Sequence, residues 1–126
     1  MIEFALGADT QPYVWLTTVG RRSGEPRMVE LWFGLDGSTI YFLAGGGEMT
    51  HWVQNALANR EVRLRMAGRG YMGRARVPEP GSEEESRARR MLAAKYQGWR
   101  EGQRLSSWAT RSFCLAVELT AETPLG

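Results

Sequence analysis

Six short segments rich in aromatic and β-branched residues run through this chain, and turn-forming residues follow most of them. Each segment has the length and composition of a β-strand. The segments are residues 13–19 (YVWLTTV), 27–35 (RMVELWFGL), 39–44 (TIYFLA), 61–67 (EVRLRMA), 71–77 (YMGRARV) and 112–120 (SFCLAVELT). Asp36-Gly37 is a hairpin turn signal between the second and third segments. We therefore expect the first three strands to form an antiparallel meander.

Two segments between these strands have the apolar spacing of amphipathic helices. The first follows Thr50, a residue type that commonly caps helices. Its apolar positions are Trp52, Val53, Ala56 and Leu57. The second begins at Ser82, which forms a capping box with Glu85. Its inward stripe comprises Ala88, Leu92, Tyr96 and Trp99. The pattern predicts a short helix after the third strand and a longer helix before the last strand.

The length and composition predict one domain. The chain has 126 residues, of which 43% are hydrophobic, and this is enough for one continuous core and too little for two. We therefore expect residues 1–126 to form a single domain. Six strands and two helices predict a mainly β (α+β) fold, arranged as a small antiparallel barrel whose closure leaves no sheet edge exposed.

Charge and cysteine content narrow the class of function. Lys and Arg number 16 against 14 Asp and Glu, and all but one of the 16 are arginine. Arginine suits phosphate and carboxylate groups, whereas a net charge of only +2 argues against a general nucleic-acid binder. One cysteine, Cys114, and one histidine, His51, cannot build a disulfide framework or a zinc site within one chain. No segment has the ~18 uncharged apolar residues of a membrane span, and we expect a cytoplasmic protein without a bound metal.

One loop concentrates positive charge between two glycines. Its sequence is GRRSG (20–24), and Arg27 follows it after Pro26. Glycines allow backbone N–H groups to approach a ligand, while guanidinium and hydroxyl groups donate hydrogen bonds to an anion. The loop therefore predicts a site for a phosphate or carboxylate group.

Three motifs resemble those of the deazaflavin (coenzyme F420)-dependent nitroreductase and quinone reductase family, in the family's order. They are LTTVGRRSGEPR (16–27), LAGGG (43–47) followed by WVQN (52–55), and ATR (109–111) followed by an apolar strand. This family lies within the flavin reductase-like split β-barrels, which are relatives of the pyridoxamine-phosphate oxidases. The resemblance implies a six-stranded split barrel that transfers a hydride from reduced coenzyme F420 to a quinone, a nitroaromatic compound or an activated enone.

The resemblance also assigns site residues. It implies that the phosphate and acidic tail of coenzyme F420 are held by Arg21, Arg22, Ser23, Gly24 and Arg27. It further implies coenzyme contacts from Ala44, Gly45, Gly46, Trp52 and Asn55, and substrate contacts from Tyr96 and Trp99, with help from Trp15, Trp32 and Trp108. No catalytic residue is assigned, although His51, which follows the glycine loop of residues 45–47, is a candidate proton donor.

The residues leave alternatives open. The same arginine loop could hold the phosphate of FMN or FAD, and a barrel of this type could also be a non-enzymatic carrier of flavin, haem or lipid. A nucleic-acid site on the basic hairpin of residues 63–76 is disfavoured, because Tyr71 is the only aromatic residue on its expected outer face. The protein could act as a monomer or as a homodimer.

Overall fold

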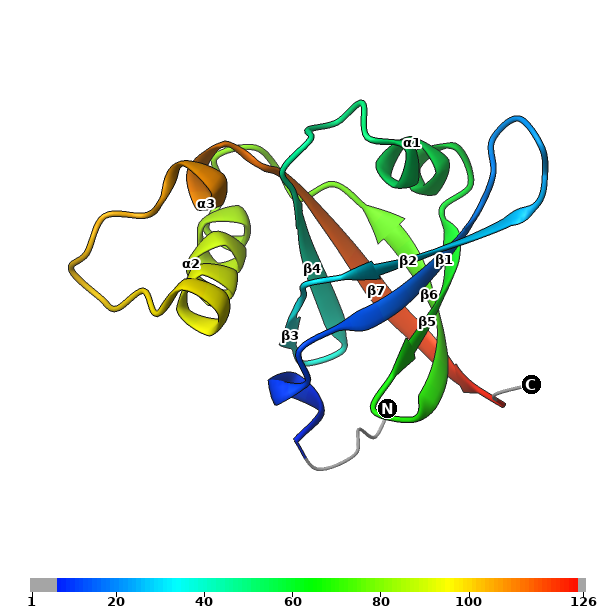
Figure 1. The fold of residues 1–126 in the computed structure, drawn as a ribbon, viewed down its shortest axis with the longest axis horizontal. Helices are drawn as coiled ribbons and strands as arrows, with labels where there is room; N and C mark the ends of the chain where they lie inside the picture. The colour runs from blue at the N-terminus through cyan, green and yellow to red at the C-terminus, as the bar shows by residue number, and fades with distance from the viewer. Residues whose placement is uncertain (1–6, 125–126) are drawn as a thin grey trace.

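Seven β-strands form one curled antiparallel sheet in the computed structural model, which describes residues 7–124 (Figure 1). The strands are β1 (Val14–Val19), β2 (Pro26–Leu31), β3 (Gly34–Asp36), β4 (Thr39–Ala44), β5 (Glu61–Met66), β6 (Arg69–Arg76) and β7 (Phe113–Thr123). Their order across the sheet is β2-β1-β5-β6-β7-β4-β3. The prediction of a mainly β, antiparallel fold is confirmed.

The segment predicted as one strand over residues 27–35 is two strands, so the prediction of six strands was wrong. The chain bends at Trp32 and Phe33 and passes from β2 at one end of the sheet to β3 at the other. Because β2 pairs with β1 and β3 pairs with β4, the predicted three-stranded meander does not form. A side chain at Gly34 would lie 2.6 Å from the sulfur of Met91, and glycine therefore lets the start of β3 approach helix α2 (Glu83–Gln97) closely.

The predicted closure of the barrel was also wrong. The two ends of the sheet, β2 and β3, are joined by the chain at the bend, but they do not pair with each other. The sheet is therefore a half-barrel with two edge strands, and β2 has a partner strand on one side only.

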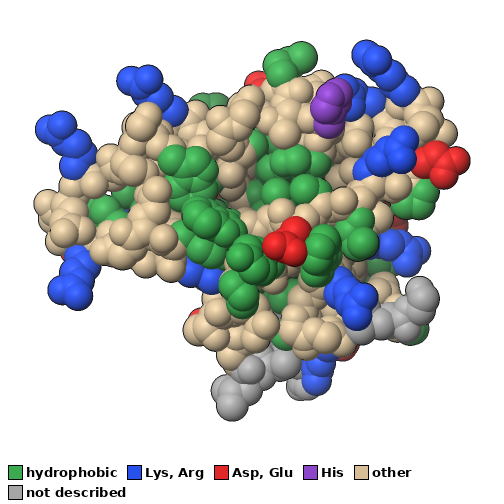
Figure 2. Space-filling model, in the orientation of Figure 1, with side chains coloured by type: hydrophobic (Ala, Val, Ile, Leu, Met, Phe, Trp, Pro, Cys, Tyr) green, Lys and Arg blue, Asp and Glu red, His purple; other side chains and the backbone are tan. Residues whose placement is uncertain are grey.

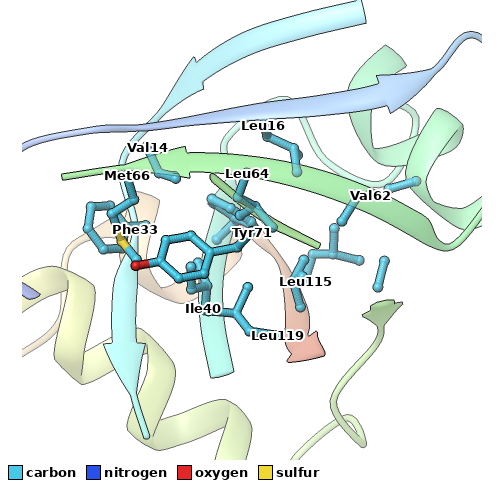
Figure 3. Packing of buried hydrophobic residues seen from close by; sticks show 14 residues of the cluster. Val14, Leu16, Phe33, Ile40, Val62, Leu64, Met66, Tyr71, Leu115 and Leu119 are labelled. Carbon is cyan, nitrogen blue, oxygen red and sulfur yellow. The ribbon is translucent and has the colours of Figure 1, made fainter. Parts of the chain in front are cut away.

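The inner face of the curled sheet holds the main hydrophobic core (Figure 3). Along β5, the inward side chains of Val62, Leu64 and Met66 alternate with Glu61, Arg63 and Arg65, which are exposed. This alternation confirms the predicted basic outer face of the β5–β6 hairpin. Tyr71 was expected on that outer face, but it is fully buried in the core.

Helix α1 (His51–Ala58) lies across one open end of the curled sheet (Figure 1). Trp52 packs edge-on against Phe42, with ring centroids 5.7 Å apart. Thr50 precedes the helix but its side chain does not cap it. The Thr50 hydroxyl instead donates to the carbonyl oxygen of Gly47 at 2.7 Å, and this bond stabilises the glycine loop before the helix.

Helices α2 and α3 (Ser107–Arg111) pack together beside the sheet. The Ser82 hydroxyl accepts a hydrogen bond from the backbone N–H of Glu85 at 3.2 Å, which confirms the predicted start of α2. The helix ends at Gly98, whose φ is 66°, and Trp99 therefore lies beyond it. The predicted inward stripe through Trp99 was wrong at that residue. None of the helices within residues 7–124 is long and apolar enough to span a membrane.

The last turn of α2 provides hydrogen-bond partners for the backbone N–H and carbonyl groups of Phe33, at the bend between β2 and β3. The Tyr96 hydroxyl accepts from the Phe33 N–H at 2.9 Å and donates to the carbonyl oxygen of Pro12 at 2.9 Å. The Lys95 ammonium donates to the Phe33 carbonyl oxygen at 3.1 Å and lies 3.6 Å from the centroid of the Phe33 ring. Burial lowers the pKa of Lys95 to about 8. Side chains of α2 thus replace the strand partners that the bend lacks.

A network of charges anchors the first turn of α2 to the sheet. Arg76 of β6 donates to Glu84 at 2.5 and 2.8 Å and to Glu118 at 2.6 Å. The Tyr41 hydroxyl also donates to Glu84, at 2.6 Å. The hydrogen bonds from Arg76 and then from Tyr41 lower the pKa of Glu84 to about 2. Glu84 therefore holds α2 against the sheet as a carboxylate.

Candidate functional site

The arginine loop, residues 20–25, is a compact turn between β1 and β2. The Gly20 N–H donates to the Glu25 carbonyl oxygen at 2.8 Å, and the Gly24 N–H donates to the Gly20 carbonyl oxygen at 2.8 Å. The Ser23 hydroxyl accepts from the Glu25 N–H at 3.1 Å. A side chain at Gly20 would lie 2.6 Å from the Ser23 hydroxyl, and Gly24 has a φ of 72°. Both glycines are therefore required by the loop's own geometry.

Helix α1 holds the arginine loop through one amide. The Asn55 side-chain oxygen accepts from the Arg21 backbone N–H at 3.1 Å and from Arg21 Nη1 at 2.8 Å. Arg21 Nη2 lies 3.3 Å from His51 Nδ1. Because a guanidinium can only donate, His51 Nδ1 is the acceptor and the ring proton is on Nε2. Asn55 is only 5% exposed, so α1 and the arginine loop form one rigid unit around Arg21.

A cavity of about 370 Å³ lies between the arginine loop, β2 and α1. Its wall combines basic, polar and apolar groups. The lining residues are Gly20, Arg21, Arg22, Ser23, Arg27, Met28, Val29, His51, Trp52 and Asn55. Figure 2 shows Lys and Arg side chains beside the histidine, with hydrophobic side chains exposed in the hollow next to it. Such a wall suits a ligand that is both anionic and partly flat and apolar.

The arginines of the cavity have no acidic partner among the residues that the structure describes. Within residues 7–124, Arg21, Arg22 and Arg27 form no ion pair with a carboxylate. The Arg27 side chain donates to the Ser23 hydroxyl at 3.3 Å, whereas Arg76 donates to two carboxylates. The positive charge at the cavity is therefore available to an anion from outside the chain.

The cavity brings together six of the twelve predicted site residues. These are Arg21, Arg22, Ser23, Arg27, Trp52 and Asn55. The other six do not line it: Gly24, Ala44, Gly45, Gly46, Tyr96 and Trp99. Gly24 shapes the loop, and Ala44 is buried at the end of β4. A side chain at Gly46 would lie 2.8 Å from the Thr50 hydroxyl, so the fold itself excludes a side chain at this position.

An aromatic cluster lies beside the glycine loop. Trp32 stacks on Tyr96 with ring centroids 4.4 Å apart and meets Trp108 edge-on at 5.5 Å. The Cβ position of Gly45 is 3.4 Å from Trp108 Cδ1, so the cluster adjoins the glycine loop. Trp99 is separate from it, because its indole N–H donates to the Gln103 carbonyl oxygen at 2.9 Å in the loop after α2.

Sequence reasoning missed Met28 and Val29 as cavity residues and left His51 outside the coenzyme contacts. Met28 and Val29 follow Arg27 on β2, so their closeness to the arginine loop was visible in the sequence. Their role depends on β2 being an edge strand that borders α1, and no local pattern indicates that position.

The curled half-barrel and its cavity lined by three arginines define a protein of the split-barrel class. Residues 5–119 match the model of a family described as F420H2-dependent quinone reductases. The chain therefore belongs to this family, and it is an F420-dependent oxidoreductase. The resemblance carried by the three motifs is confirmed. Among proteins with curated functions, none matches this sequence.

Solved structures share the fold at low sequence identity. A structure described as an F420 reductase is 21% identical, with a TM-score of 0.67, and the match covers 98% of each chain. A structure described as an F420-H2 dependent reductase is 23% identical, with a TM-score of 0.66, and the match covers 86% of this chain and 94% of that chain. A haem storage protein from Vibrio cholerae is 15% identical, with a TM-score of 0.64, and the match covers 90% and 83%.

Proposed function

We propose that the protein transfers a hydride from reduced coenzyme F420 to a quinone, a nitroaromatic compound or an activated enone, and that the cavity between the arginine loop and α1 holds the coenzyme. The observation that supports this proposal is the group of Arg21, Arg22 and Arg27, which face one cavity and form no ion pair with a carboxylate of residues 7–124. Three guanidiniums at one cavity without a carboxylate partner among the described residues favour an acidic ligand.

The residues present fit the coenzyme. Its phosphate and acidic tail need several charge-assisted donors, and the arginine loop offers guanidiniums, the Ser23 hydroxyl and a side chain-free position at Gly20. Its flat ring needs an apolar wall, and Met28, Val29 and Trp52 line the same cavity. The donor set is thus suited to the tail and the remaining wall to the ring.

Bound coenzyme F420 would supply a hydride, as a nicotinamide does. The protein would orient the ring of the coenzyme and exclude water from it. Asn55 fixes Arg21, and Arg21 in turn contacts His51. Trp52 is half-buried against Phe42, so it forms a rigid wall. His51 carries its ring proton on Nε2 and lines the cavity, and it can donate this proton to a bound oxygen atom.

We place the acceptor at the aromatic cluster. Trp32, Tyr96 and Trp108 adjoin the glycine loop, and stacked rings suit conjugated acceptors. The Tyr96 hydroxyl is occupied by the backbone of Pro12 and Phe33, so the contact from Tyr96 would come from its ring. The contact proposed for Trp99 would require the loop after α2, in which the Trp99 indole N–H donates to the Gln103 carbonyl oxygen, to move toward the cluster.

A titration with coenzyme F420, followed by fluorescence, tests the coenzyme site. We expect the double variant Arg21→Ala/Arg22→Ala to weaken binding by about 2–4 kcal/mol, and Arg104→Ala, an exposed arginine of the loop after α2, to bind like the wild type. Unchanged affinity in the double variant would contradict the site. Tighter binding of FMN or FAD than of coenzyme F420 would favour the alternative flavin cofactor.

The class of acceptor is tested by oxidation of reduced coenzyme F420 with menadione, a nitroaromatic compound and an enone. We expect a rate above background with at least one of the three, and a rate at background with all of them would contradict the proposed class of acceptor.

A further inference from the structure

The indole N–H of Trp108 is an unused hydrogen-bond donor. Trp108 is half-buried in α3. Its indole N–H has no hydrogen-bond partner within residues 7–124, whereas the indole N–H of Trp99 donates to the Gln103 carbonyl oxygen. The Trp108 nitrogen is also not one of the buried polar atoms that lack a partner in this part of the chain, so it is open to solvent. Because an indole nitrogen can only donate, this N–H is available to an acceptor atom of a ligand.

Gly45 leaves the N–H edge of the Trp108 ring uncovered (Figure 1). A Cβ at Gly45 would lie 3.4 Å from Trp108 Cδ1 and 3.6 Å from Trp108 Nε1, which are neighbouring atoms on that edge. Both distances are ordinary van der Waals contacts, and the Gly45 backbone is not in the left-handed region. Neither the space nor the backbone therefore requires glycine here, in contrast to Gly46, where a Cβ would lie 2.8 Å from the Thr50 hydroxyl. A side chain at residue 45 would instead cover the free donor.

Helix α3 holds Trp108 in a fixed position. At the start of the helix, the Ser106 hydroxyl accepts from the Ala109 N–H at 3.1 Å. At its end, Arg89 of α2 donates to the carbonyl oxygens of Ala109 and Ser112 at 3.0 and 2.8 Å, and the Arg89 side chain is only 15% exposed. A donor that is already oriented before a ligand arrives binds it at a lower entropic cost.

The surroundings of this N–H favour a flat, conjugated ligand. Trp32 meets Trp108 at 85° with ring centroids 5.5 Å apart, and Trp32 also stacks on Tyr96. Aromatic rings therefore form the walls beside the donor, and such walls bind conjugated molecules. The single N–H among these rings then distinguishes conjugated ligands that carry an oxygen at this point from those that do not.

We propose that the Trp108 N–H donates a hydrogen bond to an oxygen of the electron acceptor, and that Gly45 provides the space for this oxygen. The oxygen is the carbonyl oxygen of a quinone or an enone, or a nitro oxygen. Negative charge develops on it when the acceptor takes up a hydride, so a fixed N–H stabilises the transition state more than the neutral acceptor. The inference rests on the proposed function, in which the acceptor lies at the aromatic cluster, and it adds the atom that recognises the acceptor.

Nuclear magnetic resonance of the indole N–H groups tests the hydrogen bond without turnover. The chain has five tryptophans, and the signal that is missing in Trp108→Phe identifies the Trp108 N–H. On titration of menadione into nitrogen-15-labelled protein that carries oxidised coenzyme F420, we expect the Trp108 proton to shift downfield. Gly45→Ala should abolish this shift, because the added methyl group covers the N–H edge. Far-UV circular dichroism shows whether each variant is folded, and Gly45→Ala keeps every tryptophan in place should Trp108→Phe fail to fold.

Steady-state kinetics gives the second measurement. We expect Trp108→Phe and Gly45→Ala to lower kcat/KM for menadione roughly 10- to 100-fold, as the loss of one donor to a developing oxyanion does. The affinity of Trp108→Phe for coenzyme F420, measured by fluorescence titration, should stay at the wild-type value. Ser107→Ala is the matched control, because Ser107 is the exposed neighbour of Trp108 on α3, and it should keep both wild-type values.

The outcomes separate this inference from the proposed function. Wild-type turnover of menadione that Trp108→Phe leaves unchanged, or a Trp108 signal that does not move at saturating menadione, would overturn this inference alone. A wild-type protein that binds coenzyme F420 but reduces no acceptor would overturn the proposed class of acceptor and this inference with it. Weaker coenzyme binding by folded Trp108→Phe would place Trp108 at the coenzyme instead, and would likewise overturn its role toward the acceptor.

Discussion

The Asn55 side-chain oxygen accepts two hydrogen bonds from Arg21, one from its backbone N–H at 3.1 Å and one from Nη1 at 2.8 Å. Two donors from one residue fix the orientation of the Asn55 amide, since only the oxygen can accept them. Asn55 therefore positions Arg21 at the cavity. A buried amide on α1 thus controls the geometry of a loop that is 34 residues away in the sequence.

We expect Asn55→Ala to weaken binding of coenzyme F420 by about 1–2 kcal/mol, because Arg21 loses the acceptor that holds its backbone and side chain. Asn55→Asp keeps an acceptor but adds a negative charge beside the anion, so it should fold like the wild type and still bind more weakly. Asn59→Ala is the control, since Asn59 ends the same helix and does not line the cavity. Equal affinities for Asn55→Ala and Asn59→Ala, measured by fluorescence titration, would contradict the positioning role.

Much of the fold could be predicted because its signals are local. The alternation of buried and exposed side chains along β5, and the cap that Ser82 forms at the start of α2, each depend on residues within a few positions of one another. The bend at Trp32 and Phe33 could not be predicted, because this segment is apolar on both faces. Its backbone is satisfied by Tyr96, 63 residues later, and no pattern within the segment indicates such a partner.

The candidate site, too, could be predicted only where its signal lies in a short stretch of sequence. The arginine loop was predicted from residue types alone, since clustered guanidiniums and glycines indicate an anion site wherever the loop lies. Its separation from Tyr96 and from the glycine loop could not be predicted. Gly46 illustrates the reason: the Thr50 hydroxyl occupies the space a side chain would need, and a glycine kept for packing has the same appearance in the sequence as one kept for a ligand.

Gly20→Ala should disturb the arginine loop. The added Cβ would lie 2.6 Å from the Ser23 hydroxyl and 3.2 Å from the Glu25 carbonyl oxygen, so the loop must open and move its arginines. We expect a loss of about 1–3 kcal/mol in the free energy of unfolding and weaker binding of coenzyme F420. Gly68→Ala is the comparison, because Gly68 has a φ of 75° with open space around it. It should lower stability without changing the affinity, and a Gly20→Ala protein that binds normally would show that the loop tolerates the change.

Tyr96→Phe separates a structural role from a role in catalysis. The variant leaves the Phe33 N–H without its 2.9 Å partner at a residue that is fully buried, and we expect the free energy of unfolding to fall by about 1–3 kcal/mol. The stack of residue 96 on Trp32 is preserved, so the KM for the acceptor should change little. Tyr13→Phe, at an exposed tyrosine, is the control for stability. A variant with wild-type stability and no turnover would instead show that the hydroxyl acts on the substrate.

Protonation of Glu84 at acid pH should weaken the packing of α2 against the sheet. The pKa of Glu84 is lowered from 4.5 to about 2 in the folded protein by hydrogen bonds from Arg76 and Tyr41, so the folded state favours the carboxylate. Its stabilisation is therefore present above about pH 4.5 and is lost as the pH falls toward 2. Because these side chains are partly exposed, we expect it to be about 1–2 kcal/mol. Chemical unfolding followed across this pH range should show a shallower pH dependence for Glu84→Gln than for the wild type. Glu83→Gln, whose carboxylate is 74% exposed beside Arg90, should follow the wild-type curve, and parallel curves for Glu84→Gln and the wild type would exclude the proposed linkage.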